Sequence, residues 1–212
     1  MQTTARSSSV SAFRFLGVVF VAATFWSAIN PADYATWFFE IIVGQIGIAL
    51  LIVTRSRFQF SPMVYIVVAI HYIILACGAK YTYAEMPLFN WLKDALNLSR
   101  NHFDRVGHFA QGFTPALLVR EFLARKTPLE TTWIRNGIAV SVALAFSAFY
   151  EILEWLWVVL FYPNNGPEWL GMQGDPWDAQ ADMLMAMLGG IAALLLLGRL
   201  QDRQISRMED TH

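Results

Sequence analysis

The stretch ATWFFEIIVGQIGIALLIV, residues 35–53, decides the fold class of this chain. Glu40 is its one charged residue, and every other position can lie in hydrocarbon as part of a helix. A helix needs roughly 20 mainly apolar residues to cross a hydrocarbon core about 30 Å thick. The stretch therefore predicts a transmembrane helix.

Five further windows of similar length predict transmembrane helices. They cover residues 13–29, 61–79, 103–123, 136–162 and 178–199. The window 103–123 contains Asp104, Arg105 and His108, so hydropathy alone would not select it. We expect an all-α polytopic membrane protein, a bundle of about six transmembrane helices, with residues 1–212 forming a single integral membrane domain.

The distribution of Lys and Arg predicts the orientation, because short cytoplasmic loops collect these residues. Of the 15 Lys and Arg, Lys80, Lys93 and Arg100 fall on one side and Arg105 lies inside a helix, which leaves eleven on the side of both termini. This pattern predicts an N-in/C-in topology, and it supports the helix at 103–123, without which the basic loop after it would face outward. A cleaved signal sequence at residues 15–29 is the alternative interpretation, although no clean small-x-small cleavage site follows it.

The composition excludes several classes of protein. Hydrophobic residues make up 56% of the chain and charged residues 15%, against roughly 25% charged residues in soluble domains. The formal net charge of -1 gives no support for nucleic-acid binding, which needs clustered basic residues. Cys77 is the single cysteine, so an internal disulfide and a thiolate metal cluster are both excluded.

Ionisable residues inside the predicted helices fall at one depth, in the outer half of the membrane. Helical spacing places several of them in stripes, since residues three or four apart share a face. The stripes are Asp104, His108 and Gln111; Ser147, Glu151 and Glu154; and Asp178, Asp182, Ala186 and Gly189. We expect the stripes to face one another across a shared site.

The charges in this layer do not balance. Six carboxylates, from Glu40, Asp104, Glu151, Glu154, Asp178 and Asp182, face Arg105 as the one fixed cation. An uncompensated charge at mid-membrane costs roughly 2.5–3.5 kcal/mol even on insertion scales. The excess of carboxylates over basic groups predicts protonated carboxyl groups, a bound cation or a cavity open to water.

Helix capping explains part of this layer without any chemistry. Asp175 and Pro176 are typical of a helix start, which would make Asp178 a first-turn capping residue, and Asn101 gives Asp104 the same explanation. Four residues lie beyond the first turn and escape this explanation: His108, Glu151, Glu154 and Asp182. The functional interpretation depends mainly on these four.

Three sequence blocks carry a resemblance to a known family. The runs NHFDRVGHFAQG (101–112), YEILEW (150–155) and GDPWDAQAD (174–182) together resemble the YjdF family of bacterial inner-membrane proteins of unknown function. More distantly, Asp104-Arg-x-x-His108, the Glu151 segment, and Asp182 leading to Gly189 are similar to VanZ-like membrane proteins, a family associated with glycopeptide-antibiotic resistance.

The chain departs from the VanZ-like pattern at three positions. Arg105 stands where Lys is usual, Glu154 where Gln is common, and Ala186 where Asn is expected. The resemblance implies a cell-envelope role in a bacterial inner (plasma) membrane, and it transfers no reaction.

A metal-dependent enzyme is the first function that the residues suggest, acting on a lipid or lipid-linked head group at the outer face. The metal ligands would be His108, Glu151, Glu154 and Asp182, with Asp104 or Asp178 as general base or supporting partner and Arg105 as an anion clamp. This oxygen-rich set with one histidine suits a divalent cation such as Mg, Mn or Fe better than Zn.

Two other functions stay open. A proton- or cation-coupled transporter would load the carboxyl groups from outside, although the apolar residues 137–146 and 187–197 argue against a path inward. A non-catalytic scaffold or binding protein would use the polar network to hold its helices together. Membrane lipids are the expected partners in every case, nucleic acid is not expected, and the sequence leaves the oligomeric state open.

Overall fold

Helices make up most of the chain in the computed structural model, which describes residues 2–164, 166 and 170–209. The long helices are α1 (Gln2–Ala28), α2 (Tyr34–Thr54), α3 (Pro62–Tyr81), α5 (Phe103–Lys126), α6 (Thr132–Phe161) and α8 (Asp178–Glu209). A short 3-10 helix, η1 (Tyr83–Glu85), and α4 (Pro87–Ala95) connect α3 to α5. The all-α prediction is confirmed.

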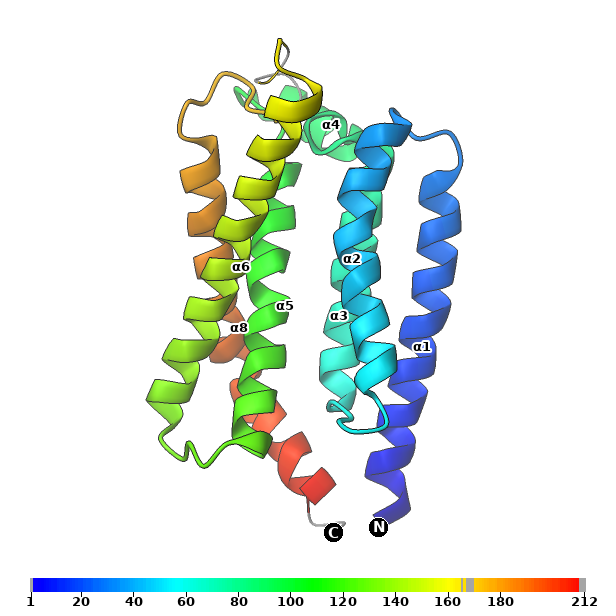
Figure 1. The fold of residues 1–212 in the computed structure, drawn as a ribbon, viewed down its shortest axis with the longest axis vertical. Coiled ribbons are helices and arrows are strands. Elements are labelled where there is room, and N and C mark those ends of the chain that lie inside the picture. Colours follow the sequence, from blue (N-terminus) through cyan, green and yellow to red (C-terminus); the bar gives the residue numbers. More distant parts are fainter. Residues whose placement is uncertain (1, 165, 167–169, 210–212) are drawn as a thin grey trace.

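The long helices form one bundle with two halves (Figure 1). α1, α2 and α3 form one half, and α5, α6 and α8 form the other. α4 lies across one end of the bundle, which we call the α4 end, while the start of α1 and the end of α8 both lie at the opposite end. The packing of α3 against α5 joins the two halves.

Five of the described helical segments are long and apolar enough to cross a membrane. They are Ser7–Ala28, Tyr34–Thr54, Pro62–Tyr81, Thr132–Phe161 and Asp178–Glu209. Their outer surfaces expose large apolar side chains, including Phe25, Val53, Phe149, Leu195 and Leu196. The chain is therefore a polytopic membrane protein, while its N-in/C-in orientation stays a prediction.

The charged helix α5 stands among these segments although its composition is too polar to qualify as one of them. Two of its charged side chains lie deep inside the bundle: Arg120 is 2% exposed and Glu121 is fully buried. Neighbouring helices supply their partners, since Arg120 donates to Asn136 of α6 and to Gln201 of α8. A helix with such paired charges can stand at membrane depth without exposing them to lipid.

α5 and α8 pack with their backbones nearly touching. A Cβ atom added to Gly112 would lie 1.8 Å from the carbonyl oxygen of Ala186, and one added to Gly189 would lie 2.0 Å from that of Phe109. In a membrane, apolar burial gives little driving force for the association of helices, so association depends on close packing. Small residues, which allow that packing, are therefore enriched at helix contacts. Ala186, which departs from the VanZ-like pattern, therefore lies at a backbone contact.

Local sequence sets the starts of α2 and α3. Asp33 accepts a 2.7 Å hydrogen bond from the Thr36 amide, which caps α2 and lowers the pKa of the Asp33 carboxyl. Pro62 occupies the first turn of α3, where its missing N–H leaves no helical bond unmade. Because α2 begins at Tyr34, Glu40 lies near the same end of that helix.

Candidate functional site

The polar site lies at the α4 end of the bundle, where four long helices present ionisable side chains. They contribute Glu40 from α2; Asp104, Arg105 and His108 from α5; Glu151 and Glu154 from α6; and Asp178 and Asp182 from α8. The structure thus brings together the seven site residues predicted from the sequence, with Glu40 beside them. Their catalytic and metal-binding roles stay predictions.

The imidazole of His108 lies at the centre of this cluster. Its Nε2 atom is 3.5 Å from carboxylate oxygens of both Asp104 and Glu151, and 3.9 Å from Oδ1 of Asp182. The residue is 5% exposed, and within the described chain its Nδ1 atom has no hydrogen-bond partner. Carboxylates from three helices therefore surround one buried nitrogen.

Two overlapping groups of ligand atoms have the spacing of a metal site. Asp104, His108 and Asp182 each offer one atom within 4.8 Å of the other two, and the same holds for His108, Glu151 and Glu154. Oε1 of Glu151 is buried, with no hydrogen-bond partner in the described chain. Oxygen ligands with a single imidazole suit hard or borderline divalent cations.

Two guanidinium groups form a network of ion pairs beside the histidine. Nη2 of Arg105 is 2.5 Å from Oδ1 of Asp178 and 3.3 Å from Oδ2 of Asp175, and Arg105 also pairs with Asp182. Nη1 of Arg100 reaches the same Asp178 oxygen at 2.5 Å. Asp178 thus binds two arginines, and Arg105 is engaged by carboxylates of its own chain.

Acidic groups still outnumber basic ones at this end. Seven carboxyl groups, from Glu40, Asp104, Glu151, Glu154, Asp175, Asp178 and Asp182, lie with the two guanidinium groups of Arg100 and Arg105. Arg100 and Asp175 extend the set inferred from the sequence, and the excess of five carboxyl groups is unchanged. Protons or a bound cation have to offset much of this charge.

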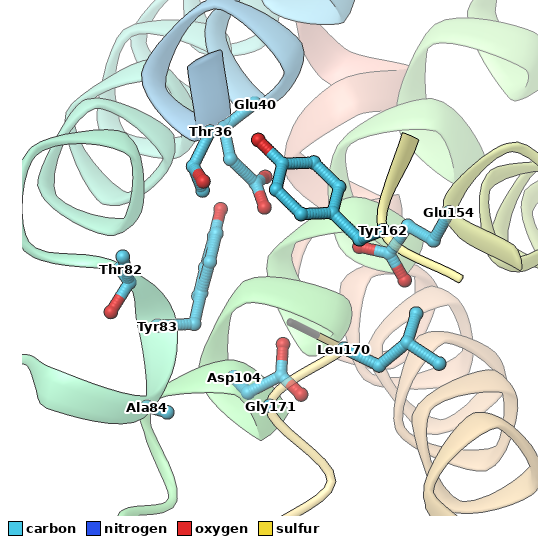
Figure 2. A pocket seen from close by; sticks show the side chains of 10 residues that line it. All are labelled: Thr36, Glu40, Thr82, Tyr83, Ala84, Asp104, Glu154, Tyr162, Leu170 and Gly171. Carbon is cyan, nitrogen blue, oxygen red and sulfur yellow. The ribbon is translucent and has the colours of Figure 1, made fainter. Parts of the chain in front are cut away.

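A cavity of about 320 Å³ opens beside the cluster (Figure 2). Its lining combines polar residues of the helices with residues of the connecting segments: Thr36, Glu40, Thr82, Tyr83, Ala84, Asp104, Glu154, Tyr162, Leu170 and Gly171. Figure 2 shows Glu40, Asp104 and Glu154 around a common space with the Tyr83 ring. We call this cavity the vestibule.

A larger cavity of about 690 Å³ meets the vestibule and continues along the bundle. It lies between α2 and α3 on one side and α5 and α6 on the other, and we call it the groove. Four residues line both cavities: Glu40, Tyr83, Asp104 and Glu154. These four therefore form the boundary between a polar opening and a long apolar channel.

Tyr83 is a site residue that the sequence did not reveal. Its ring fills the space beside two glycines, since a Cβ on Gly78 or Gly107 would lie 2.2 Å or 2.6 Å from ring atoms. Burial, and then the nearby carboxylates of Glu40 and Asp104, raise the pKa of Tyr83 well above its ordinary value. The phenol therefore remains a hydrogen-bond donor, and Gly78 and Gly107 were the only sequence signal for its position.

A second polar network, which was not predicted from the sequence, lies at the opposite end of the bundle. The carboxylate of Glu121 accepts hydrogen bonds from the amide and hydroxyl of Ser61, both 2.7 Å long, and from Arg125 at 3.1 Å. The side-chain amide of Gln201 of α8 lies 3.4 Å from the Glu121 carboxylate, to which it donates, and so joins the same network; it also donates to the Leu117 carbonyl. The i,i+4 spacing of Glu121 and Arg125 was an available signal.

Comparison with known proteins connects this architecture to one family. A family model described as "Predicted membrane protein (DUF2238)" matches residues 12–203. "Inner membrane protein YjdF" of Escherichia coli (strain K12) is 38% identical over 182 residues, which cover 86% of this chain and 87% of that protein. No solved structure gives a significant match. The predicted family and inner-membrane localisation are confirmed.

Proposed function

As a member of the DUF2238 family of predicted membrane proteins, this chain works within a bilayer, and we propose that it binds a divalent cation at the α4 end and acts there on a lipid head group. The observation that supports this most is the buried His108, whose Nε2 faces three carboxylates at 3.5–3.9 Å. A histidine that only stabilises packing needs one or two hydrogen-bond partners. Three acidic neighbours suit an imidazole that shares a cation with them.

The ligand set in this proposal is His108, Glu151, Glu154 and Asp182, with Asp104 beside them. His108 belongs to both groups of closely spaced ligand atoms, so it would ligate in either arrangement. Asp182 also pairs with Arg105, which holds its carboxylate on the His108 side of α8. A bound divalent cation would supply a Lewis acid that polarises a head-group oxygen.

This ion-pair network would position the metal ligands without contacting the cation. Arg105 holds Asp178 and Asp182, and Arg100 holds Asp178 from the other side. Because both guanidinium groups already bind carboxylates, the proposal gives Arg105 a positioning role and not that of an anion clamp. Groups that orient metal ligands in this way typically change metal affinity 10- to 100-fold when mutated.

A lipid head group enters the proposal because the cluster is reached from two directions. The vestibule leads to it past Thr82, Ala84 and Gly171, which lie outside the long helices. The groove leads to it from within the bundle. Such an arrangement fits a reaction between a water-soluble reactant and a lipid.

Mn²⁺ binding to the purified full chain tests the cation site. We expect one Mn²⁺ per chain in an electron paramagnetic resonance titration, and at least tenfold weaker binding in His108→Ala and Glu151→Gln. His102→Ala is the matched control, because His102 makes no side-chain capping bond at the start of α5 and belongs to neither ligand group. A wild-type protein that binds no stoichiometric Mn²⁺, or equal losses in the control, would refute the proposal.

A proton- or cation-coupled transporter is the second candidate, and the groove is the observation that favours it. The groove extends from Asp104 to Lys126 along α5. Before the basic Arg57 and Lys126 at its far end, the lining is mostly apolar, for example Leu118, Val119 and Phe146, which offer no relay for a proton or an ion. We therefore rank lipid chemistry above transport, and both above a purely structural role for the cluster.

A further inference from the structure

The groove has the length of a membrane's hydrocarbon core. Its lining on α5 begins at Asp104 and ends at Lys126. At 1.5 Å per residue these positions are about 33 Å apart along the helix axis. The hydrocarbon core of a bilayer is about 30 Å thick. The groove therefore runs through the whole apolar depth that the bundle occupies.

The middle of the groove is mainly apolar, with His71, Gln111 and Thr114 as polar residues in its lining. Most of its lining there is aliphatic or aromatic and comes from α2, α3, α5 and α6: Val43, Ile48, Leu51, Val68, Leu75, Leu118, Val119, Phe122, Val142 and Phe146. Carboxylates gather at its α4 end, and Arg57 and Lys126 lie at the other end. This distribution matches a chain of methylene groups with a polar head at one end.

The groove opens sideways to the surface that faces lipid. Several of its lining residues are also exposed, among them Leu50 by 59%, Phe122 by 49% and Val142 by 42%. At the α4 end Tyr150 of α6 donates a hydrogen bond to Glu40 of α2 and joins the two rims. Surrounding lipid chains therefore have direct access to the groove below that bond.

The residues at the boundary with the vestibule select the chemistry of the head group. Carboxyl oxygens accept hydrogen bonds, so Glu40, Asp104 and Glu154 suit a ligand that donates, and a cationic ligand would also offset part of the charge at this end. The excess of carboxyl groups over guanidinium groups at this end favours a positively charged donor over a neutral or anionic one. A primary ammonium group meets both conditions.

We infer that the half of the groove next to the α4 end, about the depth of one leaflet, holds one hydrocarbon chain of a membrane lipid whose amine-bearing head group lies against Glu40, Asp104 and Glu154. The inference rests on the proposed function where it identifies this head group as the one acted upon. Occupation of the groove by the chain follows from shape and polarity, so it does not require a bound metal.

Gly47 provides a way to block the groove with little disturbance. It lines the groove, and a Cβ atom added there would have no other atom within 4 Å. Leucine in place of Gly47 would project into space where the lipid chain is expected. Gly17 and Gly137 have equally open surroundings but do not line the groove, so Gly17→Leu and Gly137→Leu are matched controls.

The experiment measures lipids retained by the full chain. Wild type and variants are purified from nanodiscs that contain equal amounts of phosphatidylethanolamine and phosphatidylglycerol, and bound lipids are counted by native mass spectrometry. We expect wild type to retain one phosphatidylethanolamine, Gly47→Leu to retain at least fivefold less, and both controls to match wild type. Glu40→Gln, which can still accept from Tyr150, should reduce the preference for phosphatidylethanolamine without blocking the groove.

Each outcome separates this inference from the proposed function. Equal lipid retention by Gly47→Leu and wild type would overturn the placement of the chain, and preference for phosphatidylglycerol would overturn the head-group assignment. Should Gly47→Leu fail to fold, the Glu40→Gln comparison still decides the head group. Mn²⁺ binding by the same samples tests the cation site separately, because Gly47 lies about two helical turns from Glu40 on α2.

Discussion

The phenolic oxygen of Tyr150 donates a 2.7 Å hydrogen bond to Oε2 of Glu40, 110 residues earlier in the chain. Both residues are at most 7% exposed. The bond joins α6 to α2 at the boundary between the vestibule and the groove, where Phe39 also contacts the Tyr150 ring. It therefore connects the two halves of the bundle across the opening of the groove.

Tyr150→Phe should destabilise the protein by about 1–3 kcal/mol, because it leaves a buried carboxyl group without its donor. Thermal or denaturant unfolding in detergent measures the effect. Glu40→Gln should change stability less, since an amide oxygen can still accept from Tyr150. In the double variant Tyr150→Phe/Glu40→Gln the two losses should not add, and additive losses would show that the bond contributes nothing.

Gly112→Ala and Gly189→Ala should each destabilise the bundle by about 1–3 kcal/mol or more, because the new methyl groups would collide with carbonyl oxygens of the facing helix. Backbone atoms cannot move aside as a flexible side chain can. Gly17→Ala and Gly137→Ala have open space and should be neutral or slightly stabilising. Equal behaviour of all four variants in thermal unfolding would contradict the close approach of α5 and α8.

Hydropathy was sufficient to predict the all-α polytopic class, because the backbone can cross lipid only where its own hydrogen bonds are satisfied. Together with the Lys and Arg distribution, which supported the helix at 103–123, it was also sufficient to group the acids by depth, since depth along a helix follows directly from residue number. Glu40 on α2 and Asp182 on α8 could therefore be placed in one layer before their contacts were known.

Contacts between distant segments were beyond this reasoning. Arg100 was counted as a loop charge, yet it is buried and binds Asp178, 78 residues later, because its segment folds into the end of the bundle. The position of Tyr83 depends on the absence of side chains at Gly78 and Gly107, which the sequence does not relate to one another. Such pairings depend on which helix faces which, and no single-helix pattern contains that information.

Tyr83 should make stability depend on pH in the alkaline range. Its folded pKa is raised by burial, while in the unfolded chain it ionises near pH 10. The folded state therefore holds this proton more tightly, so the contribution is complete below about pH 10 and is lost as pH rises toward the folded pKa. In denaturant unfolding between pH 8 and 11, the advantage of wild type over Tyr83→Phe should shrink above pH 10 by at most about 1.4 kcal/mol per pH unit. A difference that is constant with pH would contradict the burial of this phenol.

Glu121→Ala should be among the most destabilising single changes at the end of the bundle opposite α4. Glu121 is fully buried and accepts from the Ser61 amide, the Ser61 hydroxyl and Arg125, so it ties the start of α3 to α5. Its removal leaves the buried amide and hydroxyl of Ser61 without their acceptor, while Arg125 keeps the Gln59 carbonyl, so we expect a loss of about 2–5 kcal/mol. Glu121→Gln should lose less, about 1–3 kcal/mol, because its amide oxygen can still accept from one Ser61 donor.

Glu130 provides the matched control for this last prediction. It is exposed in the connection between α5 and α6, so Glu130→Ala should change stability by no more than about 0.5 kcal/mol. Circular dichroism melts of the purified proteins in one detergent would rank the variants. Because the Glu121 network lies at the far end of the bundle, Mn²⁺ binding by folded Glu121→Gln should equal that of wild type. If Glu121→Ala has the same melting temperature as Glu130→Ala, the Glu121 network does not hold α3 against α5. The contacts that join the two halves of the bundle would then lie elsewhere.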